Sequence, residues 1–214
     1  MIKGIIFDMD GVISDTQKLH SLVECELLNR HSIDITPEEI TGKYAGVRTK
    51  EFFDVLLGRC GQEYDLEELI KEKWIKMEKL ADESVDEMPG SIELIKMFHK
   101  KGIPLAVASA SNLKYVRSVL GTLKVADYFH SVVGGDMVSK GKPDPEIFLL
   151  AASKINIRPE NCLVVEDGIS GMIAAKSANM KCIGLVQDRN KEYPTKNLIA
   201  SLSEITFDYL EKIY

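Results

Sequence analysis

Four acidic residues stand where their side chains could do chemistry together. Asp8 and Asp10 follow the apolar run Ile5-Ile6-Phe7, and Glu166 and Asp167 follow a second apolar run far along the chain. A cluster of carboxylates repels itself unless a hard cation lies among them, so the pattern predicts Mg²⁺, held by Glu166 and Asp167. Asp8 can act as a nucleophile because a carboxylate can accept a phosphoryl group. Asp10 can reach the leaving or attacking oxygen as a general acid and base.

A lysine and several hydroxyl or amide side chains complement these acids. Lys142 stands immediately before Pro143-Asp144-Pro145 and would neutralise the oxygens of a phosphoryl group. Ser109 ends a third apolar run and would bind the same oxygens together with nearby backbone N–H groups, although a serine also suits the cap of the next helix. Ser111 and Asn112 could contact a phosphate or simply begin that helix.

The elements that must position these residues alternate in type after Met88-Pro89-Gly90. Strands in such an alternation run parallel, through right-handed crossovers, and place a site at their carboxyl ends. The first strand is predicted over residues 3–8, and a last strand over 182–186 closes the series. The remaining predicted elements are strands over 103–109, 130–133 and 162–165 and helices over 92–101, 113–120, 146–155, 171–178 and 205–213.

Residues 16–86 contain no convincing strand and are predicted to form a helical block. Apolar residues recur there at helical spacing, most clearly from Leu66 to Leu80. The Thr-Pro pair at 36–37 suits an N-cap followed by proline at the first helical position. Trp74–Met77 is predicted to pack inside the block, whereas Lys73 is predicted to be a solvated helix lysine.

These motifs resemble the four ordered motifs of the haloacid dehalogenase superfamily. The matching residues are Phe7-Asp8-Met9-Asp10-Gly11-Val12, Ser109, Lys142-Pro143-Asp144-Pro145 and Glu166-Asp167, and the match spans the whole chain. Within the superfamily the chain is similar to the β-phosphoglucomutase-like phosphatases and sugar-phosphate mutases. The dehalogenases proper lack the second aspartate of the first motif, so Asp10 argues against halide release.

The resemblance implies an α/β fold: a Rossmann-like parallel sheet with helices on both faces, plus an inserted all-helical cap. The core would comprise residues 1–15 and 87–214, and the cap residues 16–86. The resemblance also implies a phosphoenzyme on Asp8. Mg²⁺ would be held by Asp8, Glu166 and Asp167 and by the backbone carbonyl, rather than the side chain, of Asp10.

The same resemblance indicates cap residues that would bind the substrate. His20 occupies the position of a histidine that contacts the general acid and the sugar in the mutase-like members; a purely structural histidine is the alternative. The segment containing Gly46 and Arg48 resembles the substrate-binding cap loop. The arginine that binds a distal phosphate in the mutases is replaced by Thr49, and Arg48 or Lys50 could substitute for it. Lys73 is a weaker candidate of the same kind, and a solvated helix lysine is the favoured interpretation for it.

Hydrolysis is the leading functional prediction: a Mg²⁺-dependent phosphatase of a small phosphorylated metabolite, with a sugar phosphate favoured. Asp8 would attack phosphorus, and Asp10 would protonate the departing alcohol and then activate water. The alternative is a phosphohexomutase, in which the same phosphoenzyme returns its phosphoryl group to another sugar hydroxyl. A phosphoacceptor signalling domain also uses strand-end acids, but such a domain has roughly 120 residues and no helical insertion, against 214 here.

Composition argues against several other classes. The 27 Lys and Arg residues against 33 Asp and Glu residues give a net charge of −6, without the chain-wide basic surface typical of nucleic-acid binding. No apolar run approaches the roughly 20 residues of a membrane span, and the first is too short for a signal peptide. The four cysteines lack a CxxC pair and zinc spacing. We therefore expect a cytoplasmic monomer that binds neither nucleic acid nor membrane.

Overall fold

A six-stranded parallel sheet lies at the centre of the computed structural model, which describes residues 2–44, 47–58 and 64–213. The strands are β1 (Gly4–Phe7), β2 (Leu105–Ala108), β3 (Ser131–Val133), β4 (Cys162–Glu166), β5 (Lys181–Leu185) and β6 (Asn197–Ile199). Their spatial order is β3-β2-β1-β4-β5-β6, so the direction of the series changes beside β1. Such a switch point opens a crevice at the carboxyl ends of the strands.

Helices cover both faces of this sheet. Successive strand residues point to opposite faces, so Ile5 and Phe7 pack in one apolar cluster with Phe98, while Ile6 packs in another with Phe148. The first cluster includes residues of α5 (Ser91–Lys100), α6 (Leu113–Thr122) and α9 (Phe207–Lys212), and the second includes residues of α7 (Glu146–Lys154) and α8 (Ile169–Ser177). The predicted α/β fold is therefore confirmed.

The register of the central strands brings their ends to one level. Phe7 of β1 pairs with Val107 of β2 on one side and with Val165 of β4 on the other. The next residues along β1 and β4 are Asp8 and Glu166, so their side chains emerge from adjacent strands at the same edge. All four residues of β1 are buried, as expected for the central strand of a parallel sheet.

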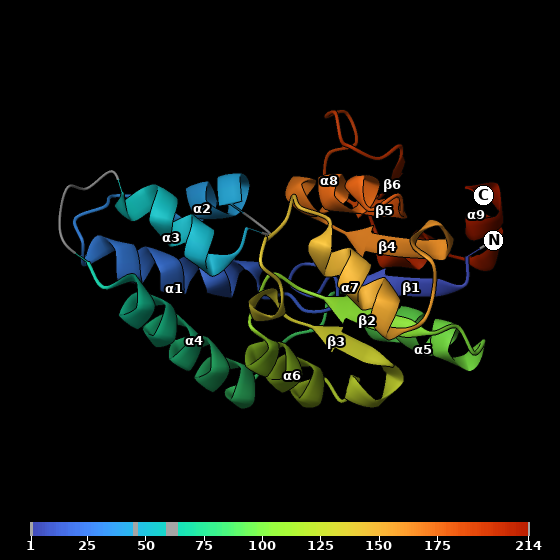
Figure 1. Cartoon of the computed structure of the whole chain (residues 1–214), viewed down its shortest axis with the longest axis horizontal. Coiled ribbons are helices and arrows are strands. Elements are labelled where there is room, and N and C mark those ends of the chain that lie inside the picture. The colour runs from blue at the N-terminus through green and yellow to red at the C-terminus, as the bar shows by residue number, and fades with distance from the viewer. Residues whose placement is uncertain (1, 45–46, 59–63, 214) are drawn as a thin grey trace.

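Four further helices gather at the end of the molecule opposite the two termini (Figure 1). They are α1 (Gln17–Asn29), α2 (Pro37–Tyr44), α3 (Thr49–Leu57) and α4 (Leu66–Glu83). The start of α2 has the predicted cap: the Thr36 hydroxyl accepts the Glu39 N–H at 3.2 Å, and the Glu39 carboxylate accepts the Thr36 N–H at 3.3 Å. Trp74 and Met77 are buried as predicted.

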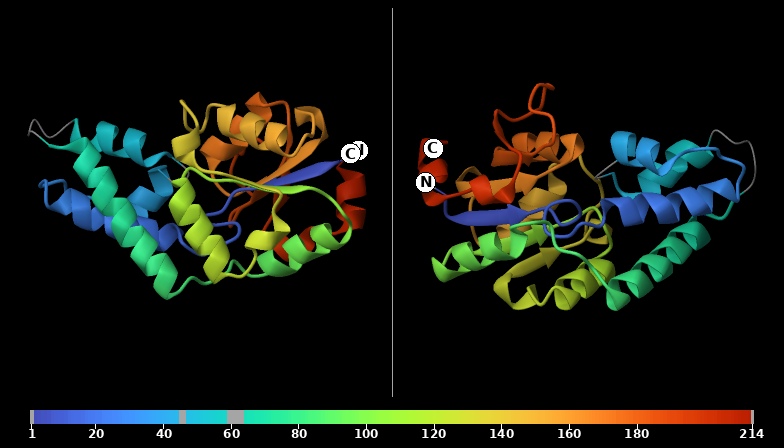
Figure 2. Two further views of the ribbon diagram at one scale, coloured as in Figure 1. Left: turned by 60° about the horizontal axis from the view of Figure 1, so that its bottom comes forward. Right: turned by 180° about the vertical axis from the view of Figure 1, so that it is seen from behind.

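Two chain segments connect this helical end to the sheet, and they lie side by side. The Asp15 N–H donates to the Asp86 carbonyl at 2.9 Å, and the Met88 N–H donates to the Ile13 carbonyl at 2.9 Å. In both views of Figure 2 the four helices stay on one side of this junction and the sheet on the other. A paired crossing of this kind can act as a hinge because few other backbone hydrogen bonds need to change.

Two sequence predictions at the end of the chain are wrong. The predicted last strand, observed as β5, does not close the series, because β6 adds a sixth strand beside it. β6 has only three residues, too few for an apolar run to stand out. The predicted final helix over 205–213 is shorter: a 3-10 turn over Leu202–Glu204 precedes α9.

No helix in the described part of the chain has the length and apolar character needed to cross a bilayer.

Candidate active site

A buried lysine joins two strand-end carboxylates. The Lys142 ammonium donates to Asp8 Oδ1 at 2.5 Å and to Glu166 Oε2 at 2.7 Å, and all three side chains are at most 6% exposed. Glu166 Oε1 accepts the Gly168 N–H at 3.0 Å, so both of its oxygens are engaged. Burial alone lowers the pKa of an ammonium, but the two carboxylates outweigh it and hold the pKa of Lys142 above its usual value. Lys142 therefore stays charged beside Asp8.

Asp167 adds a third carboxylate to this group. Oxygen atoms of Asp8, Glu166 and Asp167 all lie within 4.8 Å of one another. Burial, followed by repulsion from Glu166, raises the pKa of Asp8 to about 8 and raises that of Asp167 well above its usual value. Three crowded carboxylates with only one lysine between them fit a hard divalent cation that takes oxygen ligands, so these residues suit Mg²⁺.

Two glycines make room for these carboxylates. Gly11 has φ +88°, in the left-handed region, and a Cβ built on it would overlap the Asp167 carboxylate. A Cβ built on Gly171, in the first turn of α8, would overlap the Glu166 carboxyl group. The sequence places Gly11 in the first motif but gives no role for it, and it does not indicate Gly171 at all. A close approach between residues distant in sequence leaves no local pattern.

Asp10 lies at the centre of a separate hydrogen-bond network. Its Oδ1 accepts from the Thr16 hydroxyl at 2.6 Å and lies 3.1 Å from His20 Nε2; its Oδ2 accepts from the hydroxyls of Ser109 at 3.1 Å and Ser111 at 2.9 Å. Burial raises the pKa of Asp10, but the charge of His20 and these hydrogen bonds lower it below the usual value. Asp10 is therefore ionised, and His20 makes the contact that the family resemblance implied.

The predicted residues after β2 divide into two groups. Ser109 is completely buried: its hydroxyl accepts the Ser111 N–H at 3.1 Å as well as donating to Asp10. Asn112 caps α6, where its side chain accepts the Tyr115 N–H at 2.7 Å. Ser111 lines the cavity that contains Asp8 and Asp10, whereas Asn112 lines a second cavity.

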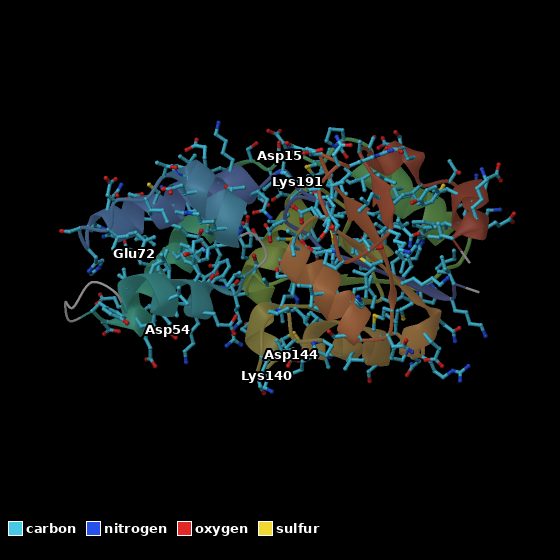
Figure 3. The ribbon with its side chains drawn as sticks, turned by 90° about the horizontal axis from the view of Figure 1, so that it is seen from above. Asp15, Asp54, Glu72, Lys140, Asp144 and Lys191 are labelled. Atoms are coloured by element: carbon cyan, nitrogen blue, oxygen red, sulfur yellow. The ribbon has the colours of Figure 1, made fainter. Side chains whose placement is uncertain are left out.

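Arg48 also lies away from Asp8. Its guanidinium donates to the Val138 carbonyl at 2.9 Å and lies 3.3 Å from Glu51, whose carboxylate accepts the Gly141 N–H at 3.3 Å. Arg48 therefore binds the loop that leads to Lys142. Figure 3 labels Lys140 and Asp144, which lie on either side of Lys142 in the sequence. Gly46, the other predicted residue of the cap loop, lies outside the described residues.

Three polar residues of the helical block lie together, and the sequence pattern did not predict that they meet. Lys73 is only 2% exposed, so its prediction as a solvated lysine is wrong. It lies in the buried stripe Leu69, Lys73, Met77 and Ala81, with one residue every four positions, and this spacing is the signal that could have revealed it. Lys73 contacts Glu24 and Thr49, and all three line the cavity next to Asp8 and Asp10.

The site combines a carboxylate at the end of the central strand with a buried lysine and a pair of acids at the end of the adjacent strand. This combination defines a class of phosphoryl-transfer proteins. The chain belongs to the haloacid dehalogenase-like hydrolase family, whose sequence model matches residues 5–185. It is an enzyme of this family, either a phosphohydrolase or a sugar-phosphate mutase.

Known relatives include both kinds of enzyme. The chain is 33% identical over 190 residues to a phosphorylated carbohydrates phosphatase of Thermotoga maritima, covering 88% of each protein. It is 31% identical over 195 residues to a β-phosphoglucomutase of Bacillus subtilis, covering 87% of this chain and 84% of the relative. Its structure superposes on a β-phosphoglucomutase of Clostridium difficile with a TM-score of 0.89, at 29% identity, covering 99% of this chain and 96% of the other.

Proposed function

We propose that this chain is a Mg²⁺-dependent phosphatase of a small phosphorylated sugar or polyol and that it acts through an aspartyl phosphate on Asp8. The observation that carries the proposal is the contact of Asp8 with Lys142, at the edge where Glu166 and Asp167 also meet. A carboxylate nucleophile beside a fixed cation can attack phosphorus while the developing charge on the phosphoryl oxygens is compensated. The relatedness to a phosphorylated carbohydrates phosphatase supports the substrate class.

The first half-reaction transfers the phosphoryl group to Asp8. Asp8 attacks phosphorus in line with the departing alcohol, and Lys142 binds the transferring oxygens and holds Asp8 in place. Asp8, Glu166 and Asp167, with the backbone carbonyl of Asp10, would hold Mg²⁺, which when bound would neutralise phosphoryl charge and orient the group. Asp10 protonates the alcohol oxygen as it leaves.

The second half-reaction returns the phosphoryl group to water. Asp10 removes a proton from the attacking water, and the network around Asp10 suits this step because it favours the ionised carboxylate. The same network makes protonation of Asp10, which the first half-reaction requires, the more costly of its two states. His20 and Thr16 therefore influence the balance between the two steps.

Residues 16–86 act in this proposal as a cap on a core of residues 1–15 and 87–214. The paired connections near Asp15 and Asp86 support a hinge at this boundary. Closure would bring α1 and α3 over Asp8 and exclude bulk water, which limits premature hydrolysis and strengthens electrostatic contacts in the site.

A sugar-phosphate mutase is the second candidate, favoured by the superposition on a β-phosphoglucomutase. The phosphoenzyme would be the same, and a sugar hydroxyl would replace water as the acceptor. One experiment separates the two: the purified protein is incubated with Mg²⁺, β-glucose 1-phosphate and a trace of glucose 1,6-bisphosphate. Release of inorganic phosphate supports hydrolysis, and glucose 6-phosphate without free phosphate supports the mutase. If neither forms and a panel of other sugar and polyol monophosphates releases no phosphate, the proposal is wrong.

A further inference from the structure

The cavity beside Asp8 and Asp10 has a second polar group of residues, which we call the distal subsite: Glu24 of α1, Thr49 of α3 and Lys73 of α4. The Lys73 ammonium donates to the Glu24 carboxylate and, at 2.8 Å, to the Thr49 hydroxyl. None of the three is more than 7% exposed.

The distal subsite has no net charge. Lys73 is the lone lysine or arginine among the described residues that line this cavity, and the Glu24 carboxylate compensates its charge. His20, which also lines this cavity, contacts Asp10. Several other lining residues carry hydroxyl groups, among them Ser21, Thr41 and Tyr44.

The nearest alternative cation does not alter this balance. Arg48 precedes Thr49, but its guanidinium is bound to the Val138 carbonyl and to Glu51 and lines a different cavity. Lys50 is exposed and lines that second cavity as well. Neither residue is therefore available to compensate a charge beside Glu24 and Lys73.

We propose that the distal subsite determines substrate specificity by binding the hydroxyl-bearing, uncharged end of a monophosphorylated sugar or polyol and by disfavouring a second phosphate. This inference rests on the proposed phosphoryl transfer at Asp8. A hydroxyl group can accept from Lys73 and donate to Glu24, so it satisfies both members of the pair. A second phosphate would lie against the Glu24 carboxylate, while the charge of Lys73 is already compensated.

The subsite also bears on the choice of acceptor. A mutase must hold one phosphate at Asp8 and a second at the distal end of the same sugar before the phosphoryl group is returned. A distal subsite that disfavours anions makes this bisphosphate complex weaker than a monophosphate complex. Water then replaces the sugar as the acceptor, in agreement with hydrolysis.

Ligand binding to a chemically inactive variant tests the inference independently of turnover. We would titrate glucose 6-phosphate, sorbitol 6-phosphate and glucose 1,6-bisphosphate into Asp8→Asn with Mg²⁺ and follow the heat. At least one monophosphate should bind about tenfold or more tightly than the bisphosphate. Adding Glu24→Gln leaves the charge of Lys73 uncompensated, so the affinity ratio should move at least tenfold toward the bisphosphate.

The chain provides a matched control on the same two helices. Glu26 and Lys76 also pair between α1 and α4, at 2.5 Å, but Glu26 is 59% exposed and neither residue lines the cavity. Glu26→Gln removes the same charge and should leave the affinity ratio unchanged. Three results would overturn the inference. The affinity ratio could shift equally in Glu26→Gln, or it could fail to shift in Glu24→Gln. The bisphosphate could also bind as tightly as every monophosphate when Glu24 is still present.

Two further variants separate specificity from a purely structural role of the ion pair. Lys73→Met leaves the Glu24 charge alone and should move the ratio toward the monophosphate, opposite to Glu24→Gln. The double variant Glu24→Gln/Lys73→Met has an uncharged subsite again, and it can fold where a single variant cannot. It should keep the preference for a monophosphate over the bisphosphate. A reversed preference in the double variant would refute the proposed specificity role. Phosphate release by the wild-type protein is measured separately, so failure of the hydrolase proposal can be distinguished from failure of the inference about the distal subsite.

Discussion

The contact between Asp8 and Lys142 joins two residues 134 positions apart in the chain, and it has a direct chemical consequence. An amide cannot replace a carboxylate as a nucleophile. Asp8→Asn should therefore reduce release of phosphate from p-nitrophenyl phosphate by roughly 10³-fold or more. The fold should remain, because a neutral amide avoids the cost of burying a charge and the repulsion from Glu166, which together raise the pKa of Asp8. Activity near that of the wild type would exclude Asp8 as the nucleophile.

The raised pKa of Asp8 predicts how pH affects stability without metal. Folding raises this pKa from 3.8 to about 8, so the protonated carboxyl is favoured in the folded state. The resulting stabilisation is complete below pH 3.8 and disappears as the pH rises through about 8. Mg²⁺ binds the ionised form, so the increase in melting temperature on replacing EDTA by Mg²⁺ should be larger at pH 8 than at pH 5. An increase independent of pH would contradict this prediction.

His20 can be tested through Asp10. His20→Gln keeps a polar side chain but removes the charge that lowers the pKa of Asp10, so this pKa should rise. The acidic limb of phosphoenzyme decay, in which Asp10 must accept a proton, should then move to higher pH. Rapid-quench measurement of protein-bound phosphate against pH would show this shift. An unchanged profile would mean that His20 only packs against Tyr115 and Trp74, with ring centroids 5.3 and 6.0 Å away.

At this scale, the residues that sequence analysis could predict are those with a local signature. Asp8 and Asp10 end an apolar run, and Lys142 precedes a Pro-Asp-Pro turn. Glu24, Thr49 and Lys73 come from three different helices, and no single segment indicates that they meet. Lys73 has the residue type of an exposed helix position, and only its place in a buried stripe of α4 distinguishes it.

Among the elements, the strands with clear apolar runs were predictable, and the weakest was not. β1 and β4 have continuous buried runs that end in acids, so their positions and the location of the site followed from the pattern. β6 is a three-residue edge strand with only Ile199 fully buried, and its pairing with β5 stabilises it more than its own composition does. Missing β6 does not affect the predicted location of the site, because β6 lies far from the β1–β4 boundary.

The start of α8 provides a prediction at the element scale. Gly171 lies against Glu166, so Gly171→Ala should displace a carboxylate that holds both Lys142 and the Gly168 N–H. We expect at least a tenfold loss of kcat/KM and a destabilisation of about 1–3 kcal/mol. Thermal unfolding and p-nitrophenyl phosphate assays would measure both.

The matched control is Gly121→Ala in α6, where nothing lies within 4 Å of the added Cβ. This change should leave activity unaltered and stabilise the protein slightly, because alanine favours a helix over glycine. If both alanine variants behave alike, the close approach to Glu166 has no functional importance.

At the scale of the whole molecule, the helical end contacts the sheet-containing part of the chain on two sides, in addition to the paired connections and the contact of His20 with Asp10. On one side α4 packs on α6, where Lys114 pairs with Glu78 at 2.5 Å and the Thr122 hydroxyl donates to the Ala81 carbonyl at 2.9 Å. On the other side Arg48 and Glu51 bind the loop before Lys142. The second contact would connect closure of the proposed cap to the loop before Lys142, the lysine proposed to bind the phosphoryl oxygens.

This arrangement gives Arg48 a positioning role that differs measurably from the distal phosphate contact considered for it from sequence. Arg48→Ala should weaken the closed arrangement and lower kcat/KM about tenfold for sugar monophosphates and bisphosphates alike, because the loop before Lys142 serves every substrate. Lys50→Ala, an exposed neighbour, is the control and should have little effect. Small-angle scattering with inorganic phosphate and Mg²⁺ should show a larger radius of gyration for Arg48→Ala only. A loss confined to bisphosphates, without expansion, would instead make Arg48 a substrate ligand and would require the Val138 and Glu51 contacts to break during catalysis.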